Sequence, residues 1–194
     1  MKPRIPPIDR GDADPRSEAQ FARIESLGGY VPNMHLTFGS HPELYSAWLP
    51  FAVHVMPNSS LPARERQILI LGTSFAWRAV YPWAHHAKIS EALRALSADE
   101  VARIADGPEH PSWSDAEAAL LRACIETRSD GRIAEGTWQL LAARYDAKQL
   151  LDIVFTIGQY GLIASALNSL EVQLEAGFEP PAWSKGAARD DRSR

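Results

Sequence analysis

The residues best suited to chemistry gather in one stretch, residues 78–90, with the sequence RAVYPWAHHAKIS. A histidine side chain has an unperturbed pKa of about 6.5, so it can accept or donate a proton near neutral pH. Adjacent side chains on a helix point about 100° apart, so only one of His85 and His86 can face inward. His86 follows Trp83 by three residues and is therefore the candidate, with Tyr81 near the start of the same helix.

Two plainer interpretations of this stretch involve no catalysis. A buried histidine is often a structural residue, and Trp83 and Tyr81 could simply fill the core. A metal site would need a third ligand, but Ser90 stands four residues after His86, and Glu91 stands five residues after it, which is poor geometry on a helix. We therefore expect no metal ion and no other cofactor.

Two long apolar segments must position this stretch. Residues 61–80 begin with polar side chains and become apolar on every face from Ile68 to Phe75, which predicts a helix buried all round. Residues 147–177 form a second segment of this type. Pro82 fits the first turn of a further helix that begins near it. Because period-two alternation is nearly absent, we predict an all-α bundle of about eight helices with two central buried helices.

Cap and stop signals predict where other helices begin and end. Ser17 is expected to cap a helix that the glycines at 28–29 stop, and Asn33 is expected to cap a short helix. The sequences SADE at 97–100 and SDAE at 114–117 both match a capping box. The chain therefore contains start signals at several points between the long apolar segments.

The distribution of proline and charge predicts three parts. Residues 1–16 are rich in both and read as an extended arm that could reach onto a neighbouring subunit. Residues 17–178 carry the helical pattern and are expected to form a single domain. Residues 179–194 are polar and charged and are expected to form a mobile tail unless a neighbouring subunit holds them.

Composition excludes several classes of protein. A net charge of -4 argues against a nucleic-acid surface, which needs clustered Lys and Arg. No apolar run reaches the 18 or so residues of a membrane span, and the N-terminal stretch does not resemble a secretory signal. One cysteine in 194 residues allows no internal disulfide. We expect a cytoplasmic protein without nucleic-acid or membrane partners, and a homo-oligomer, since so short a chain cannot easily cover two fully apolar helices.

A few polar residues lie within the apolar segments, where they cost free energy unless they are hydrogen-bonded. Gln67 stands near the polar start of the first segment, about four helical turns before Tyr81. Gln159 and Tyr160 interrupt the second segment. They could line a substrate site, but hydrogen bonds between subunits would explain them equally well.

The run LPARERQILILGTSFAWRAVYPWAHHAKIS resembles the carboxymuconolactone decarboxylase family of the alkyl hydroperoxidase D-like superfamily. Members of that family open a hydrophobic helix with Arg-Glu, continue with Tyr-Glu-Trp, and place a histidine three residues after the tryptophan. Tyr81, Trp83 and His86 keep this pattern, whereas Gln67 and Pro82 stand where the family usually has glutamates. The resemblance covers about residues 30–178, including the last long helix.

This resemblance implies an alkyl hydroperoxidase D-like fold, an oligomer such as a dimer, trimer or hexamer, and a site near the histidine. One branch of the superfamily reduces peroxides with a Cys-x-x-Cys pair, whose positions fall here on Ala79 and Pro82. Neither residue can form the thiolate that this chemistry needs. The peroxide reductase interpretation is therefore a distant third.

The other branch decarboxylates a lactone by acid/base chemistry and belongs to aromatic compound catabolism. By resemblance, His86 would transfer the proton, Tyr81 and Gln67 would orient the substrate or hold an oxyanion, and Trp83 would wall the site, with Gln159 and Tyr160 also lining it. Without a carboxylate at Gln67, burial favours neutral His86, which makes it a better base than acid. We expect a lyase-type enzyme that decarboxylates, opens or isomerises a small carboxylated, lactone or enone substrate. The alternative is a non-catalytic ligand-binding or scaffold protein of the same fold.

Overall fold

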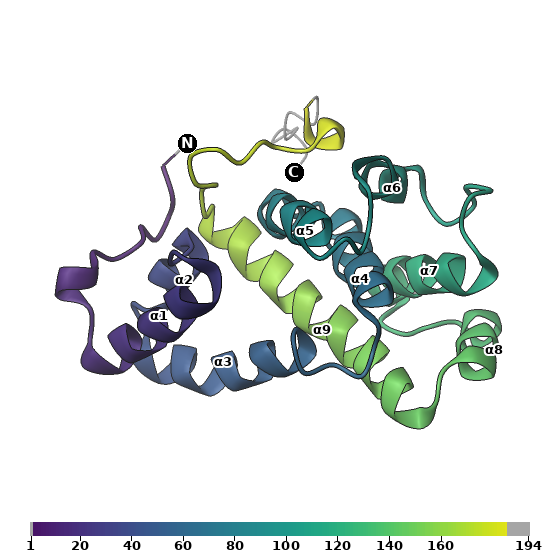
Figure 1. Cartoon of the computed structure of the whole chain (residues 1–194), viewed down its shortest axis with the longest axis horizontal. Coiled ribbons are helices and arrows are strands. Elements are labelled where there is room, and N and C mark those ends of the chain that lie inside the picture. The colour runs from purple at the N-terminus through teal and green to yellow at the C-terminus, as the bar shows by residue number, and fades with distance from the viewer. Residues whose placement is uncertain (1, 186–194) are drawn as a thin grey trace, which may run out of the picture. The chain divides into compact units, whose positions relative to one another are not determined.

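A computed structural model describes residues 2–185 of the chain, and its secondary structure there is entirely helical (Figure 1). The nine α-helices of this part are α1 (Pro15–Gly28), α2 (Asn33–Phe38), α3 (Pro42–Val55), α4 (Ala63–Ala76), α5 (Val80–Ala92), α6 (Ala98–Arg103), α7 (Asp115–Asp130), α8 (Glu135–Arg144) and α9 (Ala147–Leu170). The predicted all-α class is confirmed.

The chain folds as two compact units. The first contains residues 2–58 together with Ala166–Gly177, and the second contains Ser59–Ser165 together with residues 178–185. In the first unit, α1, α2 and α3 pack around a small core of Phe21, Tyr45 and Leu49, against which Ile8 and Ala13 also pack. Part of the predicted arm therefore contributes to this core.

Helix α4 is the centre of the second unit, where it packs against α5 and α7. Its side chains are buried without interruption from Arg66 to Ser74, as the all-round apolar pattern predicts. Gly72 allows α7 to approach closely, because a Cβ at this position would lie 3.0 Å from Leu121 Cδ2 and 3.2 Å from Cys124 Sγ. The apolar segment therefore forms a rigid support for the neighbouring helices.

Helix α9 is buried on one face only. Ile153 and Ile157 belong to the same core as α4 and α7. The opposite face exposes a set of apolar side chains, namely Leu151, Val154, Phe155 and Leu162. Burial all round is thus the right prediction for α4 and the wrong one for α9.

By its length and composition alone, α9 could span a membrane, contrary to the sequence expectation. However, 56% of its most apolar window is buried within the protein, as in a core helix.

The helix boundaries agree with the sequence signals in some places and differ in others. Both predicted capping boxes are present, at the starts of α6 and α7. Asp14 rather than Ser17 caps α1, while the Ser17 hydroxyl donates to the Gly39 carbonyl at 2.9 Å. Helix α9 ends at Leu170 instead of 177, because Glu171 adopts a left-handed conformation with φ 54°. A serine near the start of a helix can therefore hydrogen-bond to a neighbouring segment instead of capping its own helix.

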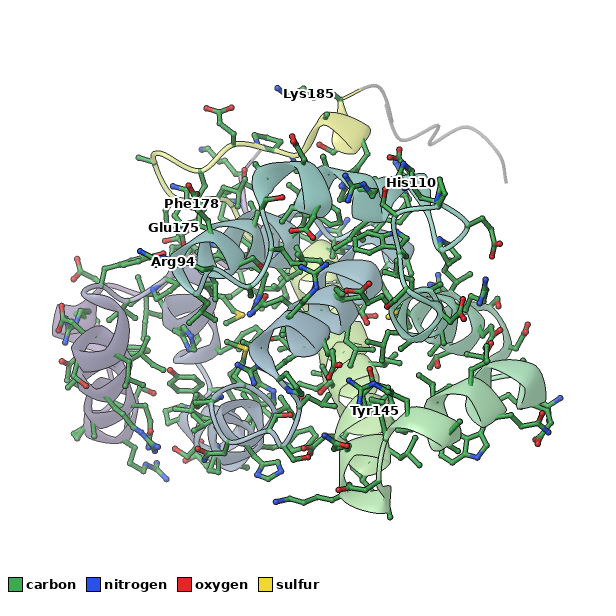
Figure 2. All side chains as sticks on the ribbon, turned by 45° about the vertical axis from the view of Figure 1, so that its right-hand side comes forward. Arg94, His110, Tyr145, Glu175, Phe178 and Lys185 are labelled. Carbon is green, nitrogen blue, oxygen red and sulfur yellow. The ribbon has the colours of Figure 1, made fainter. Side chains whose placement is uncertain are left out.

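The segment after α9 returns to the second unit and packs on aromatic side chains. Phe178, labelled in Figure 2, stacks on His85 with 4.1 Å between ring centroids. Trp183 meets Phe75 and Trp83 edge-on at 5.5 Å and 5.4 Å. The first residues of the predicted tail are therefore packed, and residues 186–194 of that tail lie outside the described part of the chain.

Candidate active site

Three helices of the second unit meet at the imidazole of His86. Its Nδ1 lies 3.0 Å from Oε1 of Gln67 on α4, and its Nε2 lies 3.0 Å from the hydroxyl of Tyr160 on α9. His86 itself lies on α5 and is 7% exposed, and Gln67 is fully buried. The Tyr160 and His86 rings are perpendicular, with 5.0 Å between centroids. A buried chain of hydrogen bonds thus joins a phenol, an imidazole and an amide.

The donors and acceptors of this chain define one protonation pattern. An amide oxygen can only accept, so His86 Nδ1 carries the hydrogen and donates it to Gln67. His86 Nε2 then has a lone pair and accepts the hydrogen bond from the Tyr160 hydroxyl. The Ser90 hydroxyl donates to the same Gln67 oxygen at 3.2 Å. These contacts hold one neutral tautomer of the ring, with Nε2 as its basic nitrogen.

Burial keeps this pair of rings neutral. Desolvation lowers the pKa of His86 to about 3, and the charges of His85 and Arg66 act in the same direction. Desolvation also raises the pKa of Tyr160 above its usual value, an effect that the Arg66 charge partly offsets. At physiological pH, His86 is therefore a potential base and Tyr160 a potential hydrogen-bond donor.

The structure brings together three of the residues singled out from the sequence, Gln67, His86 and Tyr160. Tyr81 is not part of this hydrogen-bonded chain, in which Gln67 and Tyr160 contact the two ring nitrogens of His86. Tyr81 instead stacks on His85 with 4.5 Å between ring centroids. These two residues are four apart and share a face of α5, which differs from the face that carries His86. The hydroxyl at the imidazole comes from Tyr160 on α9.

Trp83 and Gln159 are both buried, in different surroundings. Trp83 is 4% exposed and packs in the core of the second unit, edge-on to Trp183. Gln159 immediately precedes Tyr160, and its side-chain oxygen has no hydrogen-bond donor among the described residues. Trp83 therefore packs in the core and supports α5, whereas Gln159 has a buried acceptor without a donor among the described residues.

Arg66 is a residue that the sequence reasoning missed. It is 9% exposed, directly precedes Gln67, and donates from Nη1 to the Leu61 carbonyl at 3.0 Å. Its charge influences the pKa of both His86 and Tyr160. The Arg-Glu pair in the resemblance contained the signal, because Gln67 occupies the glutamate position and Arg66 the arginine position.

Other reactive groups lie away from this site. Cys124 is fully buried on α7, its thiol contacts the Leu120 carbonyl at 3.3 Å, and burial raises its pKa to about 12. Among residues 2–185 there is no group of three or more His, Cys, Asp or Glu side chains that could hold a metal ion. The groups that meet at His86 can transfer protons and donate or accept hydrogen bonds.

The fold is that of the alkylhydroperoxidase AhpD core. A peroxidase-related protein from Ralstonia eutropha JMP134 shares it with a TM-score of 0.79 and 17% identity, over 91% of this chain and 94% of that chain. A peroxidase-related protein from Silicibacter sp. TM1040 matches with a TM-score of 0.76 and 17% identity, over 91% and 95%. At these identities the likeness establishes the fold.

A third solved structure is that of the debrominase Bmp8, a variant of which was crystallised with 2,3,4-tribromopyrrole. It matches with a TM-score of 0.76 and 22% identity, over 89% of this chain and 91% of that chain. No protein-family model and no curated protein sequence matches the chain. The solved structures therefore show an AhpD-like helical fold.

Proposed function

We propose that this chain is a thiol-free enzyme of the carboxymuconolactone decarboxylase type. Its substrate would be a small carboxylated molecule bearing a lactone or enone, and the reaction a decarboxylation, lactone opening or isomerisation of the kind found in aromatic compound catabolism. The observation that carries the proposal is the buried chain from Tyr160 through His86 to Gln67. It gives a neutral base and a hydroxyl donor in contact with each other, as proton transfer next to a carbonyl requires.

The two ends of this chain would act on different atoms of the substrate. When the Tyr160 hydroxyl turns to the carbonyl oxygen of a bound substrate, it releases the lone pair on His86 Nε2. This nitrogen removes a proton from the carbon next to the carbonyl, while Tyr160 stabilises the enolate oxygen. The proton returns to another carbon of the conjugated system, so isomerisation is balanced. Gln67 accepts from Nδ1 throughout and holds the ring in position.

The test measures turnover of carboxymuconolactone and of a panel of related lactone acids, with the change in ultraviolet absorbance as the readout. His86→Gln and Tyr160→Phe should each lower kcat at least 100-fold, because one removes the base and the other removes the hydroxyl. Tyr81→Phe is the matched control and should retain activity, since its ring lies on His85. Wild-type turnover that survives in His86→Gln would disprove the proposal.

A second candidate is a non-catalytic protein that binds small ligands or serves as a scaffold. Its support is that both ring nitrogens of His86 are satisfied within the protein, as in a structural histidine. The replacement of the family glutamates by Gln67 and Pro82 also favours it. A protein that binds lactone acids but converts none of them at enzyme concentrations near 10% of substrate would support this alternative.

We further propose that the protein is a cytoplasmic homo-oligomer. The support is the apolar face of α9, where Leu151 is 60% exposed and Leu162 is 57% exposed. Light scattering should give a mass above 21.4 kDa at micromolar concentration, and Leu162→Glu should lower it. A compact monomer in wild type would exclude an oligomer.

A further inference from the structure

Arg66 is a buried cation to which the protein supplies no counter-ion. Among residues 2–185, no carboxylate lies within ion-pair distance of its guanidinium, and its Nε has no hydrogen-bond acceptor. The contact of Nη1 with the Leu61 carbonyl is a neutral one. A charge in this position is unfavourable unless a partner compensates for it.

The other arginines near the start of α4 do have carboxylate partners. Arg64, two residues earlier and more exposed, forms ion pairs with Glu100 and Glu117, both at 2.7 Å. Glu65, between the two arginines, has Oε1 3.8 Å from Arg144. These acidic side chains near the start of α4 thus interact with Arg64 and Arg144. Arg66 is the most buried of the three arginines, and it is the one without a carboxylate partner among the described residues.

The unpartnered donors lie on the residues that form the candidate active site. Gln67, adjacent to Arg66, places its oxygen on His86, and its Nε2 donor has no acceptor among the described residues. Arg66 directly precedes Gln67 on α4, and its positive charge acts to lower the pKa of both His86 and Tyr160. One buried positive charge without a counter-ion therefore lies next in sequence to an amide that has an unpaired donor and that is hydrogen-bonded to His86.

We propose that Arg66 binds a carboxylate of the substrate and so places the adjacent carbon next to His86 and Tyr160. This inference rests on the proposed function and names the group of the substrate that Arg66 would hold, a carboxylate. The planar guanidinium matches a carboxylate through two parallel hydrogen bonds. A single buried cation balances one negative charge, which favours a carboxylate over a phosphate dianion.

The experiment measures binding and needs no turnover. The probes are 5-oxotetrahydrofuran-2-carboxylate, a saturated lactone acid, its uncharged methyl ester, and inorganic phosphate, each measured by calorimetry and by the shift in Tm. Wild type should bind the acid, and the ester should bind at least tenfold more weakly. Phosphate that binds more tightly than the acid, an ester that binds as well as the acid, or an acid that does not bind at 50 mM would each overturn the proposal.

The variants locate the binding to Arg66. Arg66→Gln should weaken binding of the acid at least tenfold, and Arg66→Lys should give an intermediate loss because it retains the charge without the fork geometry. Arg64→Gln is the matched control and should bind the acid like wild type. In the absence of ligand, Arg66→Gln should have the Tm of wild type or a higher one, because an uncompensated charge is removed. A large fall in Tm would assign Arg66 a structural role and overturn the proposal.

These outcomes separate this inference from the proposed function. Acid binding that depends on Arg66, without turnover of any lactone acid, would leave the carboxylate site standing and refute the enzyme. Turnover that is unchanged in Arg66→Gln would leave the enzyme standing and refute the carboxylate site.

Discussion

The burial of His86 predicts that the protein loses stability as the pH falls below neutral. In the unfolded chain this histidine has a pKa of about 6.5. In the folded protein, desolvation lowers its pKa to about 3. Between these two values the unfolded chain binds a proton that the folded protein does not bind. The free energy of unfolding must therefore rise with pH in this window and fall as the solution is acidified.

The magnitude follows from the two pKa values. Each pH unit inside the window changes the free energy of unfolding by about 1.4 kcal/mol for one proton. Between pH 7 and pH 4.5, His86 should therefore account for a loss of about 2.5 kcal/mol. Carboxylates such as Glu100, whose pKa is lowered from 4.5 to about 2, begin to contribute near the lower end of this interval, but their contribution cancels when wild type is compared with a variant that lacks only His86.

The assay is urea unfolding at half-unit steps from pH 4.5 to pH 7. His86→Gln removes the titrating group, and the glutamine amide can still hydrogen-bond to Gln67 and Tyr160. Between pH 7 and pH 4.5, the free energy of unfolding of this variant should therefore fall by about 2.5 kcal/mol less than that of wild type. His85→Gln makes the same substitution at the adjacent position of α5 and is the matched control for the exchange itself. Equal slopes in wild type and His86→Gln would show that the ring is solvated or already protonated.

Three further predictions concern single side chains. Gln67→Glu places a carboxylate 3.0 Å from the imidazole and favours its charged form by about 5 kcal/mol at an effective dielectric constant of about 20, so an NMR titration should show a higher pKa; an unchanged midpoint would mean that the groups do not meet. Cys124→Ala should leave any turnover of a lactone acid unchanged, with or without reductant, because the thiol is buried and its pKa is high; a loss would restore thiol chemistry. Gly161→Ala brings a Cβ to 2.8 Å from Trp77 Cζ2 and should destabilise the fold by about 1–3 kcal/mol in urea unfolding, whereas Gly158→Ala, with open space around it, should not.

Local sequence patterns predicted the helices well, because each pattern acts within a few residues. The capping boxes at 97–100 and 114–117 are present, since the serine and glutamate of each box bond to the same turn. The burial of α4 follows from apolar side chains on every face. Glycine is the usual stop and predicts the end of α9 at Gly177, which does have a φ of 86°, but Glu171 adopts a left-handed conformation earlier and ends the helix at Leu170.

The partners of His86 depend on contacts between distant parts of the chain. Spacing along one helix indicated which histidine faces inward, but it could not indicate which residue of another helix would bond to the ring. The hydroxyl that reaches the ring belongs to Tyr160, 74 residues away, and only the packing of α5 against α9 determines this. The burial of Arg66 could not be predicted for a similar reason. A charged residue near the start of a helix is usually solvated, and its burial depends on the surrounding helices.

The nitrogen NMR spectrum of His86 tests the central claim most directly. With the ring buried between the Gln67 oxygen and the Tyr160 hydroxyl, Nδ1 should have the chemical shift of a protonated ring nitrogen and Nε2 that of an unprotonated one, without change from pH 8 to pH 5. Two protonated nitrogens, or a titration centred near the usual histidine value, would contradict a neutral imidazole poised to accept a proton.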